Sequence, residues 1–268
     1  MKIYSLASRL SRSFFSSFFL KPMVFWDRTH GFLKRNTEEE TTRKIVAYSQ
    51  KDRDKWVEQK TFTISAGAKV LDVGAGTCPY KNLFKHCEYR THDFKKYEGP
   101  KLDAKEYGHI DYVSDICSIP VKDSSFDVIL CTEVLEHVPM PIDALQEMAR
   151  ILKPGGRLFL TAPFTAGQHQ LPFHYYSGFA PAWYKHFCAE FGLSIAELTP
   201  NKGYFKFMAM ETNRVAHYIK ADEKLQDKDF DLKYYLFGIW MPNYLEKLEK
   251  KKFIDTFTTG FFVEAIKK

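Results

Sequence analysis

The stretch V-L-D-V-G-A-G-T-C-P-Y, residues 70–80, decides the fold of this chain. Its apolar residues predict a buried strand over 69–73, and Gly74 and Gly76 predict a tight turn that leads into a helix. Backbone N–H groups at such a turn can approach a ligand closely. The sequence lacks the G-K-[ST] ending or third glycine of a phosphate-gripping loop, so we expect a polar ligand other than a triphosphate.

Strand-like and helix-like runs alternate after this stretch, which is typical of an α/β protein with a parallel sheet covered on both faces. Further strands are expected at 88–93, 111–114, 126–132, 157–162, 193–198 and 260–266. Helices are expected at 142–152 and 179–191, and from the capping box at 37–40 as far as Val57. Two apolar helical segments, 203–220 and 231–252, precede the last strand. No linker separates them from the sheet, so we interpret 203–252 as a helical insertion rather than a second domain.

We interpret residues 1–35 as a basic aromatic N-terminal arm and residues 36–268 as the main domain. The first 26 residues carry Lys2, Arg9, Arg12 and Lys21 and no acid. Serines interrupt their apolar run, which argues against a signal peptide or a membrane span. Three interpretations stay open: a flexible or packed arm, an interfacial amphipathic helix on anionic lipid, and a transit peptide.

The composition is that of an ordinary globular protein, 45% hydrophobic and 27% charged over 268 residues, with 24 Phe and 15 Tyr. The net charge is +6, and the arm supplies most of the excess, so a nucleic-acid groove on the main domain is disfavoured. The five cysteines lack the spacing of a zinc site, and we expect reduced thiols in a cytoplasmic protein. Peripheral membrane contact and oligomerisation stay open.

Acidic residues stand at or next to the ends of three of the expected strands: Asp72, Asp93 and Asp115. Ligands of open parallel sheets bind outside the carboxyl ends of the strands, so we expect these carboxylates to gather at one edge. Such a group suits a ligand with hydroxyls and an amine rather than phosphates. The alternative is that each Asp caps a following helix, but three in register with a G-x-G turn favour a binding site.

The run V-L-D-V-G-A-G-T resembles the class I S-adenosylmethionine-dependent methyltransferases. So do D-I-C-S-I-P, S-F-D-V-I-L-C-T-E-V-L-E-H-V and L-K-P-G-G-R-L-F-L-T-A-P-F, most closely in the ubiquinone-biosynthesis-like, or type 11, branch. The resemblance covers residues 68–200 and the last strand. It implies a Rossmann-like seven-stranded methyltransferase sheet whose last strand is antiparallel. To this sheet the residues of this chain add the N-terminal helical arm and the helical insertion before the last strand. The resemblance further implies that S-adenosyl-L-methionine is the cofactor.

The resemblance also implies roles for individual residues. Asp72, Gly74 and Gly76 would hold the methionine portion of the cofactor, and Asp93 the ribose hydroxyls. Asp115 and the backbone of Ile116 would hold the adenine. Glu133 would line the methionine side of the cofactor and the substrate entrance.

Two histidines are candidate catalytic bases, His137 just beyond the strand 126–132 and His174 in the loop 163–179. That loop is rich in His and Tyr, which can bind hydroxyls and stack on a ring; a purely structural role is the alternative for both. We find no convincing set of acids for a catalytic metal and expect none. The expected reaction is methylation, preferably on oxygen, of a small-molecule, glycan or lipid-linked acceptor. The rival hypothesis is a non-catalytic membrane-associated scaffold that keeps the fold.

Overall fold

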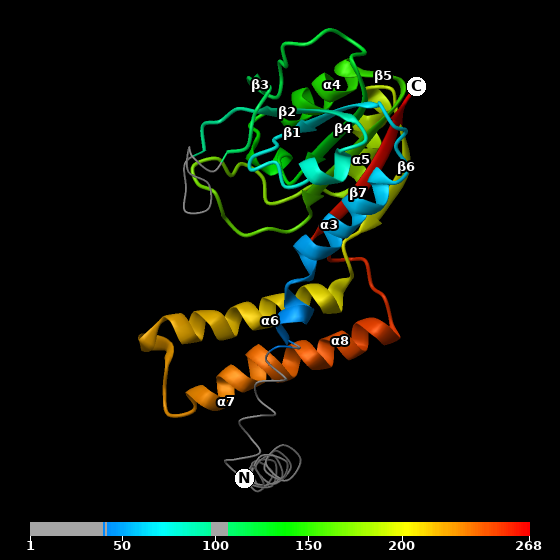
Figure 1. Cartoon of the computed structure of the whole chain (residues 1–268). Helices are drawn as coiled ribbons and strands as arrows, with labels where there is room; N and C mark the ends of the chain where they lie inside the picture. The colour runs from blue at the N-terminus through cyan, green and yellow to red at the C-terminus, as the bar shows by residue number, and fades with distance from the viewer. Residues whose placement is uncertain (1–39, 41, 98–106) are drawn as a thin grey trace, which may run out of the picture.

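The computed structural model describes residues 40, 42–97 and 107–268. They form one seven-stranded sheet in the order β3-β2-β1-β4-β5-β7-β6 (Figure 1). The strands are β1 Lys69–Val73, β2 Glu88–Asp93, β3 Tyr112–Val113, β4 Phe126–Thr132, β5 Leu152–Pro163, β6 Leu193–Pro200 and β7 Gly260–Lys267. Strand β7 runs antiparallel to both of its neighbours, and the other pairs are parallel. The predicted Rossmann-like sheet with an antiparallel last strand is confirmed.

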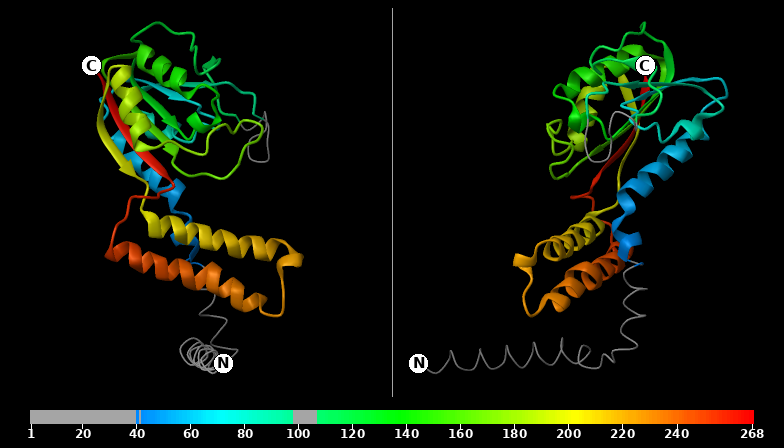
Figure 2. Two further views of the ribbon diagram at one scale, coloured as in Figure 1. Left: turned by 180° about the vertical axis from the view of Figure 1, so that it is seen from behind. Right: turned by 60° about the vertical axis from the view of Figure 1, so that its left-hand side comes forward.

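Side chains of the central strands alternate between two hydrophobic cores, one on each face of the sheet. Leu71 and Ile129 point into the larger core, which is closed by helices α4 Pro141–Ile151 and α5 Pro181–Glu190. Val70 and Leu130 point into the smaller core, which α3 Tyr48–Thr61 covers from the opposite side (Figure 2). The continuous apolar strands expected of a sheet buried on both faces are therefore present.

An ion network fixes α3 to the last two strands. The Lys60 ammonium lies 2.5 Å from a carboxylate oxygen of Glu197 on β6 and 2.6 Å from one of Glu264 on β7. Arg157 of β5 binds Glu264 at 2.8 Å from the other side. Trp56 stacks on Phe262 with ring centroids 5.3 Å apart, so both charged and aromatic contacts hold α3 against the sheet.

Three local expectations are wrong. Between residues 74 and 87 the chain makes a turn and the short 3-10 helix η1 Lys81–Phe84 in place of an α-helix. Strand β5 begins at Leu152 rather than at 157, because K-P-G-G forms an irregularity inside the strand where the register jumps. The helix expected from residue 37 is interrupted by a turn at Ala47, and α3 continues to Thr61. The capping box lies mostly outside the described residues, as does the whole arm 1–35.

The chain between β6 and β7 forms a helical hairpin that projects from the sheet (Figures 1 and 2). It consists of α6 Tyr204–Ala221, η3 Glu223–Leu225, α7 Phe230–Tyr235, the π-helix η4 Leu236–Trp240 and α8 Met241–Lys251. The carboxylate of Glu249 on α8 accepts backbone N–H bonds from Gly203 and Lys206, which satisfies donors at the start of α6. The predicted helical insertion is therefore present. Among the described residues, no helix combines the length and the hydropathy that a bilayer crossing requires.

Candidate functional site

A cavity of about 500 Å³ lies across the carboxyl ends of β1, β2, β3 and β4. This is the edge where ligands of open α/β sheets bind, and the volume is within the range of small-molecule sites. Its described walls comprise Gly74, Gly76, His92, Asp93, Phe94, Lys96, Tyr97, Tyr107, Val113, Ser114, Asp115, Ile116, Glu133, Val134, His137, Val138, Pro139, Gln170, Phe173 and Tyr175. Seven of the nine residues predicted for the site lie on these walls.

The glycine turn is held in place by β2. Gly74 and Ala75 both donate their N–H groups to the carbonyl of His92, and Gly76 donates to a carboxylate oxygen of Asp93 at 3.0 Å. Gly74 has φ +72°, and a Cβ built on it would stand 2.4 Å from a methyl carbon of Val134. Glycine is required there both by the left-handed backbone and by the close approach of the next strand's loop.

Asp93 is buried and still faces the cavity. Its second carboxylate oxygen accepts the backbone N–H of Lys95 at 2.8 Å. A carboxylate has lone-pair sites beyond the two that these N–H groups use. Asp93 can therefore hold the turn and accept ligand hydroxyls at once.

Asp72 lies behind the turn and is absent from the described walls of the cavity. It is buried on β1, and its carboxylate accepts the hydroxyl of Tyr89. Burial, with a contribution from the Asp93 charge, raises the pKa of Asp72 to about 7 against the lowering effect of the Tyr89 hydrogen bond. The structure thus separates Asp72 from the other two strand-end acids, which it brings to one cavity.

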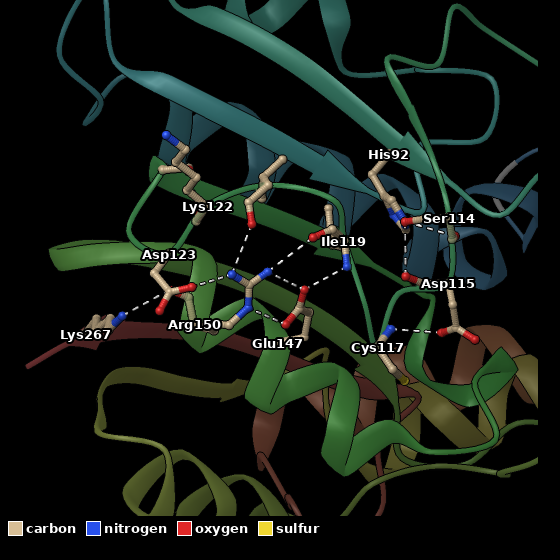
Figure 3. A network of polar contacts seen from close by, with 12 residues as sticks. His92, Ser114, Asp115, Cys117, Ile119, Lys122, Asp123, Glu147, Arg150 and Lys267 are labelled. Atoms are coloured by element: carbon tan, nitrogen blue, oxygen red, sulfur yellow. Dashed lines mark hydrogen bonds and ion pairs between the residues drawn. The ribbon is translucent and has the colours of Figure 1, made fainter.

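Asp115 and Ile116 form the far wall, beyond β3. The carboxylate of Asp115 accepts the N–H of Cys117 at 2.9 Å, which shapes a local turn rather than capping a helix. The segment that follows is fixed by α4, because Glu147 accepts the N–H of Ile119 at 2.7 Å (Figure 3). Arg150 binds both oxygens of Glu147 at 2.7 Å and donates further bonds to carbonyls of the same segment.

Glu133 ends β4 in a left-handed conformation, with φ 53°. Its carboxylate accepts the hydroxyl of Thr161 at 2.8 Å, and its N–H binds the Thr161 carbonyl at 2.9 Å. Non-glycine residues adopt this backbone at a cost, and such positions concentrate at functional sites. The bend turns the side chain of Glu133 from the sheet into the cavity wall.

The two predicted catalytic histidines lie close together, with ring centroids 6.0 Å apart. Of the two, His137 is among the described wall residues of the cavity and His174 is not. His137 Nδ1 is 2.5 Å from the carbonyl oxygen of Phe173. Burial lowers the pKa of His137 to about 4; the Phe173 contact opposes this shift, and the nearby His169 and His174 add to it. The pKa of His174 is lowered too, by desolvation and by His169. Both shifts favour the neutral imidazole.

Several wall residues escape sequence reasoning. His92 is buried at the end of β2, with Nε2 3.1 Å from the carbonyl and the hydroxyl of Ser114. Phe173 and Tyr175 reach the cavity because the N–H groups of Tyr175 and Tyr176 bind the carbonyl of Glu136. His92 has a signal in the sequence, since it directly precedes a strand-end acid. Phe173 has none beyond its aromatic character, whereas Tyr175 belongs to the His- and Tyr-rich loop that the sequence marks as able to bind hydroxyls and stack on a ring.

Known proteins resemble this chain in sequence and in fold. A family model described as a methyltransferase domain matches residues 71–160. A demethylmenaquinone methyltransferase from Staphylococcus haemolyticus is 32% identical over 42% of this chain and 51% of its own length. A ubiquinone biosynthesis O-methyltransferase from Xanthomonas oryzae is 34% identical over 36% of this chain and 43% of its own length. The chain thus spans about half the length of these curated relatives or less.

A solved structure from Galdieria sulphuraria, described as a candidate sarcosine dimethylglycine methyltransferase, aligns with a TM-score of 0.51. It is 18% identical, over 81% of this chain and 84% of the other. The chain therefore shares a Rossmann-like fold with this solved structure, and its cavity lies at the carboxyl edge of the sheet. The match of the methyltransferase-domain model to residues 71–160 agrees with the resemblance found in the sequence.

Proposed function

We propose that this protein is an S-adenosylmethionine-dependent methyltransferase that acts on oxygen. The carrying observation is the cavity that gathers the glycine turn, Asp93, Asp115 and Glu133 at one sheet edge. The described walls carry three carboxylates and one ammonium, that of Lys96, and this charge balance suits hydroxyls and amines rather than phosphates. The methyltransferase domain over residues 71–160 supports the same assignment.

The residues present fit this cofactor, and each wall has a proposed role. Gly74 and Gly76 admit the methionine portion close to the backbone. Asp93 accepts bonds from the ribose hydroxyls, and Asp115 with the backbone of Ile116 holds the adenine. Glu133 takes the methionine side and the substrate entrance. To Asp72, bonded to Tyr89 behind the turn, we assign positioning of the turn rather than contact with the cofactor.

S-adenosylmethionine, when bound, supplies a methyl group on a sulfonium sulfur. In such a transfer the acceptor oxygen would bond to the methyl carbon as the sulfur–carbon bond broke, and the electron pair of that bond would stay on sulfur. The protein contributes alignment and exclusion of water. The hydroxyl proton of the acceptor passes to a base, for which His137 on the wall, with His174 behind it, is the proposed group.

The acceptor side is proposed to be the loop 164–180 together with the insertion. Phe164 of this loop packs against Phe257, and Phe257 packs against Phe207 of α6, with centroids 5.9 and 5.7 Å apart. This aromatic path connects the loop 164–180 to the helical hairpin, which carries exposed apolar residues such as Tyr218 and Trp240. It supports a small-molecule, glycan or lipid-linked acceptor, and the quinone-pathway names of two relatives are consistent with a phenol.

Isothermal titration calorimetry with S-adenosylmethionine tests the proposal. The wild-type chain is expected to bind, Asp93→Ala to bind far more weakly, and the exposed Asp255→Ala to match wild type. Absence of binding by the folded wild-type chain would refute the assignment. A tritiated-methyl transfer assay on lipid and aqueous extracts then identifies the acceptor fraction.

A non-catalytic membrane-associated scaffold is the rival function. Its motivation is the basic, aromatic segment 1–26, whose four Lys and Arg residues are accompanied by no acid. Flotation with anionic liposomes, with and without residues 1–26, tests membrane attachment. Flotation that needs this segment, combined with no cofactor binding, would favour the scaffold.

A further inference from the structure

Three histidines converge beside the cavity. His137 comes from the 3-10 helix η2 Leu135–His137, while His169 and His174 come from the irregular loop 164–180. One ring nitrogen of each lies within 4.8 Å of the others. The His169 ring is 4.8 Å from that of His137 and 4.7 Å from that of His174, centroid to centroid.

Backbone carbonyls determine which nitrogen of two rings is free. His137 Nδ1 faces the carbonyl of Phe173 at 2.5 Å, and His169 Nδ1 faces the carbonyl of Gly167 at 2.9 Å. A carbonyl oxygen only accepts, so Nδ1 carries the proton in both rings and Nε2 keeps its lone pair. Metal-bound histidines are commonly oriented by this same N–H to carbonyl contact.

The two free nitrogens face one carboxylate. Glu136 Oε1 lies 3.6 Å from His137 Nε2 and 4.0 Å from His169 Nε2. The Glu136 side chain is 1% exposed, and within the described residues its Oε2 has no hydrogen-bond partner. Both ring nitrogens of His174 are likewise buried without a hydrogen-bond partner in the described part of the chain. Such unpaired buried polar atoms are costly unless something else satisfies them.

We propose that His137, His169 and His174 bind a zinc ion, with Glu136 facing the fourth position. Imidazole nitrogen suits zinc, whereas magnesium and calcium prefer sites built from oxygen. Three histidines with one open or carboxylate-facing position are a known catalytic zinc arrangement. Binding requires the ring nitrogens to close to about 3.3 Å, the spacing that Zn–N bonds of about 2.0–2.1 Å set in a tetrahedral site. The loop that carries two of the ligands can supply this movement because it has no regular secondary structure.

The position of the site gives it a role, and this extension rests on the proposed methyl transfer. His137 forms part of the cavity wall, so the ion stands where the acceptor enters. A zinc ion lowers the pKa of a bound hydroxyl. With zinc bound, the acceptor hydroxyl would occupy the fourth position, and its proton would pass to the carboxylate of Glu136, which faces that position.

The test measures zinc binding rather than activity. Full-length protein is stripped with a chelator, and zinc is added back in a calorimeter, with the bound metal counted by mass spectrometry. The wild-type chain is expected to bind about one zinc per chain. His169→Ala and His174→Ala are expected to weaken binding at least about tenfold. His186→Ala is the matched control, because its ring is 71% exposed on α5.

Thermal melting of each variant checks that it folds, and cobalt in place of zinc gives a visible spectrum that reports the nitrogen ligands. No zinc bound to the wild-type chain, or unchanged affinity in both folded variants, would overturn the site. Cofactor binding is measured in parallel on His169→Ala, since His169 is outside the described cavity walls. Zinc binding without S-adenosylmethionine binding would refute the proposed function and leave the metal site standing.

Discussion

The carboxylate of Asp93 holds the backbone N–H of Gly76 at 3.0 Å, so the end of β2 fixes the turn that follows β1. A single side chain therefore joins the two strand ends that form one wall of the cavity. Removing this side chain therefore takes away a hydrogen-bond acceptor for the ligand and also changes the shape of the turn.

Asp93→Ala is expected to weaken S-adenosylmethionine binding about 10- to 100-fold, since hydrogen bonds to charged groups contribute about 1.5–3 kcal/mol. Asp93→Asn keeps one acceptor oxygen and should therefore lose less affinity for S-adenosylmethionine than Asp93→Ala does. Calorimetric titration measures both, with Asp255→Ala as the control. Equal affinity in Asp93→Ala and wild type would exclude Asp93 from the binding site.

Gly74→Ala is expected to destabilise the fold by about 2–4 kcal/mol, through left-handed strain and collision with Val134. Adding Val134→Ala removes the collision and leaves the strain, so the double variant should recover part of the loss. Urea unfolding of the four proteins gives the coupling between the two sites. If the effects of Gly74→Ala and Val134→Ala on the free energy of unfolding were strictly additive, the two residues would not be in contact.

Asp72 predicts a pH dependence of stability. Its pKa is raised from 3.8 to about 7, so the folded state keeps a proton that the unfolded chain loses near pH 4. Unfolding releases this proton, and the contribution to stability declines as pH rises from about 4 to 7.

The Asp72→Asn variant lacks this proton. The free energy of unfolding of the variant, measured relative to that of wild type, should therefore increase as pH rises through the same interval, by on the order of 4 kcal/mol at most. Denaturation at several pH values checks the sign, with Asp255→Asn as the control. A difference that shrinks as pH rises would contradict a raised pKa.

Lys60→Met is expected to lower the free energy of unfolding by about 2 kcal/mol, because Glu197 and Glu264 lose a largely buried cation. The loss is moderated since Arg157 still binds Glu264. Lys55→Met, at an exposed position of the same helix, is the matched control. Guanidinium would screen charges, so urea denaturation is the suitable measurement.

Strands were predictable because their signals are local. The apolar run 126–132 and the acid-ended run 88–93 match β4 and β2 to the residue. The position of the cavity could be predicted from these strands, because the carboxyl ends of parallel strands lie at one edge of the sheet. The helix expected after Gly76 was wrong because Pro79 and the short span to Cys87 leave room for η1 alone within residues 74–87.

Contacts between distant segments were beyond sequence reasoning. Asp72 reads like Asp93 in sequence, yet Tyr89 on the neighbouring strand takes up its carboxylate. The histidine cluster was missed because its ligands have no recognisable spacing: two loop residues meet a third some thirty positions earlier only through the bonds of Glu136 and Phe173. Such meetings depend on tertiary structure, which spacing rules do not encode.

The placement of β7 between β5 and β6 also bears on how the chain is made. Strand β6 leaves the ribosome before residues 201–259 have been translated, and its pairing partner follows them. At roughly 5–20 residues per second the delay is roughly 3–12 s, long compared with helix formation. The helical hairpin can therefore form on the nascent chain while β6 is still unpaired and β5 is the edge of the sheet. Once formed, the hairpin brings its two ends together and so places β7 between β5 and β6.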